Sequence, residues 1–281
     1  MKLKSYFNKS SLNFGLWGAI GAFIPEFLSE FIMNHDNPSN GFFSSFFSVS
    51  FWIGLIAIGV SISLLLKLYK STNKKIVINK EFLFVILKQI GIGALIGGIA
   101  QIIYFIIQGF SGEFGRIICW GIAGSGLGIS ISKIIPNYPL NKGKYAGFIG
   151  GILGGLFFSL VSSSGIPMFG RLIGTAIIGF FIGLLISVFE QLYREAWITL
   201  KWAENEFTNI SLGNKPIYIG SGAKSDIYLP VEKNYPSTTA IISFSNGKVK
   251  IDDKLSGKTT ELKNGSKINL GFVELIINTK T

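Results

Sequence analysis

The chain has 281 residues, of which 48% are hydrophobic and only 15% are charged, and it contains 35 glycines. The charged fraction lies well below the roughly 25% that is usual for soluble domains. The formal net charge is +11, but the residues from 191 onward carry 12 Lys/Arg against 9 Asp/Glu, so most of the excess lies in the apolar part. Positive charge between apolar segments is typical of membrane-topology signals and argues against a nucleic-acid partner.

The chain has one cysteine, Cys119, and one histidine, His35. Cys119 has no second cysteine with which to form an intramolecular disulfide, and we interpret it as a small packed side chain in an apolar run. A single histidine without a Cys/His cluster gives no support to a zinc site. We therefore expect no metal and no cofactor.

Six apolar runs predict six membrane-spanning helices, because each is near the ~20 residues that cross a hydrocarbon core of about 30 Å. The first run follows a basic N-terminus and could be mistaken for a signal peptide. Pro25, Glu26 and further runs follow it, so we interpret it as a retained helix. The expected transmembrane domain, 1–193, consists of three hairpins with spans at about 13–33, 42–66, 82–108, 115–133, 144–162 and 169–191.

The connections between these runs separate by charge. One side carries 11 Lys/Arg, whereas the other carries only Arg116 and Arg171. The positive-inside rule then predicts a multi-pass cell-membrane protein with both termini in the cytoplasm. The basic side consists of Lys2, Lys4, Lys9, Lys67, Lys70, Lys74, Lys75, Lys80, Lys133, Lys142 and Lys144.

Small residues recur every three or four positions in several of these runs, which places them on one helix face. Apolar side chains gain little from packing together in lipid, so close backbone approach at small residues holds such helices together. We expect a glycine-zipper packing within the bundle, and a homo-oligomer is an open alternative. The predicted packing residues are Gly93, Gly97, Gly98, Gly147, Gly150, Gly151, Gly154 and Gly155.

An internal repeat supports the pairing of spans into hairpins. Phe114–Arg116 and Phe169–Arg171 open matching spans, and Gly59–Ser63, Gly128–Ser132 and Gly183–Ser187 share a pattern further along even-numbered spans. Three hairpins of one orientation would follow. The alternative is chance coincidence in apolar sequence of low complexity.

Two carboxylates, Glu26 and Glu30, are four residues apart and so share a face of the first helix. A carboxylate within a membrane span suggests a cation site or a proton relay. The interpretation we favour is that Pro25 marks the end of the span and that both groups lie at the outer interface.

The remaining polar candidates of the membrane half are Lys88, Arg116 and Arg171. We expect Lys88 to extend toward the cytoplasmic surface rather than to contact a substrate. The two arginines open matching spans, where they face lipid phosphates or pair with Glu26, Glu30 or Glu113.

After Trp197 the pattern changes to short β-rich runs, which predict a β-sandwich. Turn signals lie between the runs, notably Asn246-Gly247 and Asn264-Gly265. We expect a linker at 194–204 and a cytoplasmic domain at 205–281. The predicted strands are Pro216–Gly220, Asp226–Leu229, Ala240–Phe244, Lys248–Asp252, Thr259–Leu262, Lys267–Leu270 and Val273–Asn278.

This β-rich part resembles the forkhead-associated (FHA) domain, a SMAD/FHA-like β-sandwich. The resemblance covers about residues 205–280 and does not extend to the helices. It is carried by Leu212–Gly213, Ile217–Gly220, Ser225–Leu229, Ala240–Ile242, Val249–Asp253, Ser256–Thr259 and Leu262–Gly271, of which the last is the most specific.

The resemblance implies partner binding through loops at one end of the sandwich, by Ser221, Lys224, Ser237, Thr238, Thr239 and Lys258. FHA domains bind phosphothreonine peptides, but the arginine of their pattern is Ser221 here, and their Ser-Arg-x-His falls on Pro236-Ser237-Thr238-Thr239. Their Asn-Gly before Thr is replaced by Gly257-Lys258. Because the charged bidentate groups are missing, we expect no phosphothreonine dependence. Lys224 or Lys233 acting as point charges is the alternative.

The favoured function is a membrane scaffold or signalling protein whose FHA-like module binds a cytosolic protein. A small transporter or channel assembled or regulated by the module is the alternative. An enzyme is not expected, because the sequence has no Ser-His-Asp grouping, metal-ligand spacing or phosphate loop.

Overall fold

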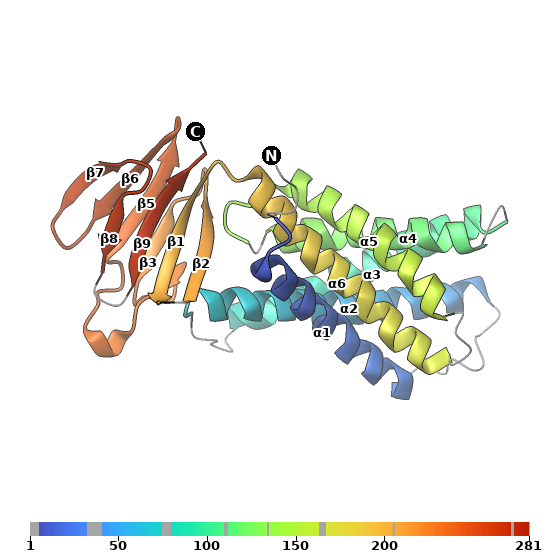
Figure 1. Ribbon diagram of the computed structural model, residues 1–281. Helices are drawn as coiled ribbons and strands as arrows, with labels where there is room; N and C mark the ends of the chain where they lie inside the picture. Colours follow the sequence, from blue (N-terminus) through green and yellow to red (C-terminus); the bar gives the residue numbers. More distant parts are fainter. Residues whose placement is uncertain are drawn as a thin grey trace. The chain divides into compact units, whose positions relative to one another are not determined.

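The fold is described from a computed structural model, and Figure 1 shows its ribbon. The structure describes residues 6–32, 41–74, 80–109, 112–133, 135–162, 167–204, 206–270 and 273–280. The chain divides into two compact units, which are treated separately below. The helical unit consists of Met1–Lys67, Val77–Ile134 and Pro139–Leu192, and the β unit consists of Leu68–Ile76, Ile135–Tyr138 and Tyr193–Thr281.

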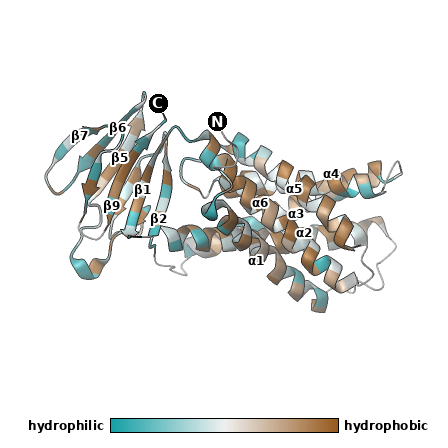
Figure 2. Cartoon of the chain, in the orientation of Figure 1, coloured by the Kyte–Doolittle hydropathy of each residue, from teal (hydrophilic) through white to brown (hydrophobic). Residues whose placement is uncertain are grey.

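Six helices in the described residues are long and apolar enough to cross a membrane, which confirms the expected number. Figure 2 shows hydrophobic residues along most of each of them. The chain is therefore a multi-pass membrane protein. The helices are α1 (Lys9–Ile32), α2 (Phe42–Ser71), α3 (Lys80–Ile107), α4 (Gly112–Ser132), α5 (Leu140–Ser162) and α6 (Pro167–Tyr193).

Glycines bring the backbones of α4 and α5 into direct contact. A Cβ atom added to Gly147 would lie 2.0 Å from the carbonyl oxygen of Gly124, and one added to Gly151 would lie 2.1 Å from that of Trp120. Any side chain at these positions would force the two helices apart.

The other glycines predicted to pack also face a neighbouring helix. Gly150 and Gly154 of α5 approach the α6 backbone at Ile182 and Ile178. The remaining contacts join Gly155 to Trp120 on α4, and Gly93, Gly97 and Gly98 of α3 to Ala57, Ile53 and Phe46 of α2.

Pro25 lies inside α1, which continues to Ile32. Proline has no N–H, which leaves the carbonyl of Gly21 without its helical donor. Gly59 of α2 packs against that carbonyl, since an added Cβ at Gly59 would lie 2.0 Å from Gly21 O and 2.3 Å from Pro25 Cγ. A neighbouring helix therefore covers the interruption, as membrane helices commonly arrange.

Buried polar side chains join helices elsewhere in the helical unit. Gln89 of α3 accepts hydrogen bonds through Oε1 from Ser61 of α2 and Ser130 of α4. Gln191 of α6 donates to Ser11 of α1 at 2.7 Å. Both serines bonded to Gln89 lie in the pattern from which the internal repeat was inferred, and the repeat itself stays a prediction.

The β unit is a sandwich of two sheets, with strand orders β2-β1-β9-β8 and β4-β3-β5-β6-β7. This confirms the expected architecture of membrane helices followed by a β-sandwich. The seven strands predicted from the sequence are present within about a residue or two of their expected bounds. The strands are β1 (Ala196–Ala203), β2 (Glu206–Leu212), β3 (Ile217–Gly220), β4 (Ile227–Tyr228), β5 (Ala240–Ser245), β6 (Lys248–Asp253), β7 (Lys258–Leu262), β8 (Lys267–Asn269) and β9 (Glu274–Thr279).

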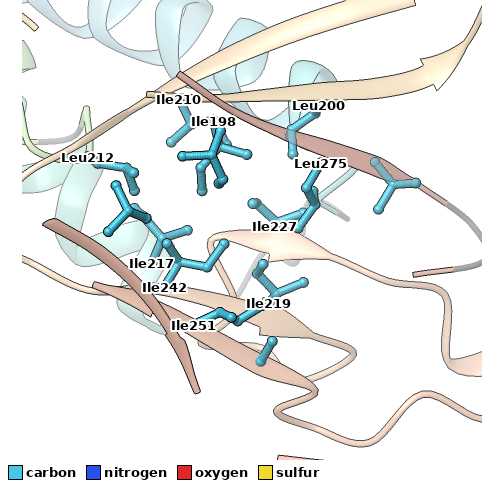
Figure 3. Packing of buried hydrophobic residues seen from close by; sticks show 14 of the residues in the cluster. Ile198, Leu200, Ile210, Leu212, Ile217, Ile219, Ile227, Ile242, Ile251 and Leu275 are labelled. Atoms are coloured by element: carbon cyan, nitrogen blue, oxygen red, sulfur yellow. The ribbon is translucent and has the colours of Figure 1, made fainter. Parts of the chain in front are cut away.

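Branched aliphatic side chains fill the space between the sheets. Figure 3 shows Ile198, Leu200 and Leu275 of the first sheet directed toward Ile219 and Ile242 of the second. All five are fully buried. Alternating inward residues on both sheets are the usual basis of such a core.

The linker expected at 194–204 is wrong, because these residues include strand β1 (Ala196–Ala203). β1 lies between β2 and β9 and pairs antiparallel with both. Its buried residues Ala196, Ile198 and Leu200 alternate with partly exposed residues, which is the period of two that is typical of a strand. Aromatic and charged side chains at the partly exposed positions hide this period in the sequence.

Two segments from elsewhere in the chain complete the β unit. Asn137 donates through Nδ2 to the carbonyls of Ser211 and Lys215, and its Oδ1 accepts from the Lys215 N–H at 2.9 Å. The carbonyl of Ser71 accepts from the Trp202 indole, and that of Thr72 accepts from the Tyr228 N–H. These contacts satisfy backbone groups at the ends of strands.

Several residues used in the sequence predictions lie outside the described part of the chain. These are Lys2, Lys4, His35, Lys75 and Gly271.

The helix contact predicts a difference between two glycine substitutions. Gly147→Ala should lower the stability of the purified protein by about 1–3 kcal/mol, the usual cost of overpacking, because the methyl group meets the Gly124 carbonyl. Gly91→Ala should leave stability unchanged or raise it, since an added Cβ there meets no described atom within 4 Å. Thermal unfolding of both variants in the same detergent measures the difference, and equal losses would contradict the contact.

Candidate functional site

The pairing register of the second sheet gathers three loops at one end of the sandwich. Ile219 of β3 pairs with Ala240 of β5, Ala240 pairs with Asp253 of β6, and Asp253 pairs with Lys258 of β7. The loops that leave these strands therefore lie at the same edge of the sheet. We call them the apical loops, and they comprise 221–226, 229–239 and 254–257.

Hydrogen bonds join the first two apical loops. Ser221 donates through Oγ to the carbonyl of Tyr235 at 2.6 Å, and its N–H donates to the carbonyl of Pro236. The Gly222 N–H donates to the carbonyl of Ser237, and a Cβ at Gly222 would lie 2.7 Å from that oxygen. The side chain at position 221 is thus part of the loop framework.

The structure places most of the predicted partner-binding residues on the accessible part of these loops. Lys224, Ser237 and Lys258 are exposed, and Ser221 and Thr238 are half-buried. Thr239 is 0% exposed, so its predicted contact with a partner is wrong. It is the residue directly before β5, and its N–H donates to the Ile219 carbonyl of β3.

The positive charge of the β-sandwich comes from lysines alone, since residues 195–281 contain no arginine. Lys224 and Lys258 are exposed at the apical loops. A lysine is a point charge, whereas an arginine offers the planar fork that binds phosphate in two places. The exposed lysines of this surface therefore offer point charges in place of that fork.

No protein-family profile and no curated protein sequence matches the chain. One solved structure that is similar to its C-terminal β region comes from a structural and functional analysis of phosphothreonine-dependent FHA domain interactions. The match covers 98% of that chain and 30% of this one, with 19% sequence identity and a TM-score of 0.27.

Two apical aspartates were not predicted from the sequence. Asp253 accepts hydrogen bonds from Ser256 Oγ and the Leu255 N–H, and these lower its pKa. Asp226 accepts a hydrogen bond from the Tyr218 N–H at 3.0 Å. Burial raises the pKa of Asp226, although this hydrogen bond and the charge of Lys74 act to lower it. The Asp-x-x-Ser spacing at 253–256 is a turn signal that would have indicated the first site.

In the helical unit, the polar candidates separate into exposed and buried groups. Lys88 is exposed, and Arg116 forms an exposed ion pair with Glu113 on its own helix at 2.9 Å. Arg171 of α6 instead forms a two-point ion pair with Glu30 of α1.

Glu26 lies next to the Glu30–Arg171 pair, and the interpretation that both carboxylates lie at the outer interface stays a prediction. Glu26 is nevertheless 0% exposed. The reason is that α1 continues through Pro25 and packs closely on α2 and α6. Trp52 of α2 donates through its indole N–H to Glu26 Oε2.

The two aspartates predict opposite pH effects on the stability of the β unit. The pKa of Asp226 is raised in the folded state, so its favourable contribution is present below the unfolded pKa and is lost as pH rises through the folded one. Asp226→Asn should therefore gain stability relative to wild type as the pH rises above the ordinary aspartate pKa of about 3.9.

Asp253→Asn is the matched control, and its stability relative to wild type should change with pH in the opposite direction. The pKa of Asp253 is lowered, so wild type gains stability above the unfolded pKa and the variant does not. Denaturant unfolding of the purified chains, followed through β-sheet signals at several pH values, measures both. Differences of the same sign would contradict the assigned environments.

Proposed function

We propose that this chain is a membrane scaffold with a signalling role, whose FHA-like β-sandwich binds a cytosolic protein partner. A binding role rather than a catalytic one is supported by the exposed apical loops, which are held by backbone hydrogen bonds. Such loops on a rigid sandwich are common binding surfaces. FHA domains generally bind proteins, which is consistent with this use.

The observation that carries the proposal is that hydrogen-bonded loops, whose positive charges are lysines, stand where FHA domains have phosphate-binding groups. Ser221 stands where FHA domains have an arginine, and its hydroxyl donates a hydrogen bond to the carbonyl oxygen of Tyr235. Recognition of the partner then depends on loop shape and on Lys224 and Lys258, without phosphothreonine.

The cytoplasmic placement of the β-sandwich rests on charge asymmetry in the sequence. The positive-inside rule places the lysine-rich connections and both termini in the cytoplasm. The partner would then be a cytosolic protein, and the helices would hold it at the inner surface of the membrane.

Site-specific photo-crosslinking in cells tests the binding surface. A photoreactive amino acid in place of Lys224 or Lys258 should crosslink the full chain to the same protein partner, because both residues are exposed at the apical loops. The control is Lys248, which is equally exposed but follows the Asn246-Gly247 turn at the opposite end of the sheet. The measurement is the mass-spectrometric identity and yield of each adduct.

The apical binding site would be contradicted if position 248 gave the same adduct in equal yield, or if positions 224 and 258 gave no adduct. A second result would contradict the phosphate-independent part alone. That result is selective binding of phosphothreonine peptides over their unphosphorylated forms by the purified chain.

A small transporter or channel is the second candidate function, and the buried Glu26 beside the Glu30–Arg171 pair favours it. Charged groups inside a helix bundle commonly mark ion pathways. On this alternative, proteoliposomes with wild-type protein should carry a cation or proton flux that Glu26→Gln abolishes. Flux equal to that of empty liposomes would exclude this function.

A further inference from the structure

Three ionisable side chains of α1 and α6, namely Glu26, Glu30 and Arg171, lie together in the helical unit beside Trp52 of α2. Arg171 donates through Nε to Glu30 Oε1 at 2.6 Å and through Nη2 to Glu30 Oε2 at 2.7 Å. Both are charge-assisted hydrogen bonds, which are stronger than neutral ones, and both join the Arg171 guanidinium to the same Glu30 carboxylate. The side chains of Arg171 and Glu30 are only 23% and 8% exposed, so the pair is largely shielded from solvent.

Glu26 lies one helical turn before Glu30 and is the second carboxyl of this cluster. The residue is 0% exposed. Its Oε2 accepts from the Trp52 indole N–H, whereas its Oε1 is buried and has no hydrogen-bond partner among the described residues. A neutral indole donor does not neutralise a carboxylate, so the charge of Glu26 would be uncompensated.

The charge balance of the cluster decides the state of Glu26. With both carboxylates ionised, the cluster would carry two negative charges and one positive charge in a low-dielectric interior. An unpaired buried charge is strongly unfavourable, and an ionisable group in such a place takes its neutral form instead. If Glu26 binds one proton, the net charge of the cluster becomes zero.

We propose that Glu26 is a proton-binding site of the membrane-spanning unit, held as a neutral carboxylic acid while Glu30 neutralises Arg171. The charged groups that act on Glu26 are Glu30 on its own helix and Arg171 on α6. From α2 the group in contact is the uncharged Trp52, whose ring in turn meets Trp120 of α4 at 5.3 Å. The Glu113–Arg116 pair is exposed and separate.

A proton fits this site better than a metal cation. Hard cations require several oxygen ligands, whereas Glu26 Oε2 is already engaged by an N–H donor. Among the residues that the structure describes, no group of three or more His, Cys, Asp or Glu side chains could hold a metal ion. A proton needs only the single oxygen that remains.

Release of the proton would change the contacts between α1 and α6. The O–H bond of Glu26 breaks, the proton passes to water, and the electron pair stays on the carboxylate. A second carboxylate then competes for Arg171, on two helices that touch at Gly18 and Gly179, where an added Cβ at Gly18 would lie 2.2 Å from Gly179 O. The site thereby links the protonation of Glu26 to helix packing.

Infrared difference spectroscopy of the full chain in lipid nanodiscs tests the site. Wild type at neutral pH should show the carbonyl band of a protonated, buried carboxylic acid, and the band should disappear at alkaline pH. Glu26→Gln should abolish it. Glu113→Gln is the matched control and should keep it, since Glu113 is 60% exposed and ion-paired.

A second variant keeps the test decisive if Glu26→Gln fails to fold. Trp52→Phe retains the carboxyl and removes its donor, so the band should remain and shift to higher frequency. Absence of the band in wild type, or its persistence in Glu26→Gln, would overturn the proposal. Loss of the band on addition of sodium or potassium at constant pH would also overturn it, in favour of a cation site. The proposal holds independently of any partner of the β-sandwich.

Discussion

The helical unit depends on backbone-to-backbone contact between helices that carry no side chain at the point of closest approach. Gly124 and Gly147 meet in this way on α4 and α5, as do Gly18 and Gly179 on α1 and α6. In lipid there is no hydrophobic gain from burying one aliphatic side chain against another, so such contacts provide the dispersion and dipolar attraction. The same close approach excludes solvent from whatever polar group lies between the helices.

This exclusion explains why the polar groups of the helical unit have specific partners. Gln89 holds two serines from neighbouring helices, and Arg171 holds Glu30 through two hydrogen bonds. A buried polar group without a partner is costly in a low-dielectric medium. The β-sandwich is stabilised differently, by an aliphatic core between two sheets in which Ile198, Leu200 and Ile242 are fully buried.

The sequence predicted the elements that have a strong period or a strong length signal. The six membrane helices followed from apolar runs, and most strands from short runs between turn residues such as Asn246-Gly247. Strand β1 was missed because its inward Ala196, Ile198 and Leu200 alternate with residues such as Trp197 and Lys201, which hide the period of two. Pro25 does not interrupt α1, because Gly59 of α2 covers the carbonyl that the proline leaves without a donor.

The candidate sites were harder to predict, because they depend on contacts between residues far apart in the chain. The ion pair of Arg171 was one of several pairings that the sequence allowed, and only packing selected Glu30. Thr239 shares a short polar run with Ser237, yet Thr239 is buried and Ser237 is exposed, since Thr239 directly precedes β5 and already bonds to Ile219 of β3. Lys224 and Lys258 are exposed, as charged side chains usually are, and their contact with a partner stays a prediction.

The contacts of Asn137 bear on how the β unit is assembled during synthesis. Asn137 and Thr72 hydrogen-bond to Ser211, Lys215 and Tyr228, all of which are translated later. The first-made segments are therefore present when the sandwich emerges from the ribosome, and the strands can close on them at once. A gene fragment encoding only the C-terminal residues would lack the four hydrogen bonds that Asn137 and Thr72 make to Ser211, Lys215 and Tyr228.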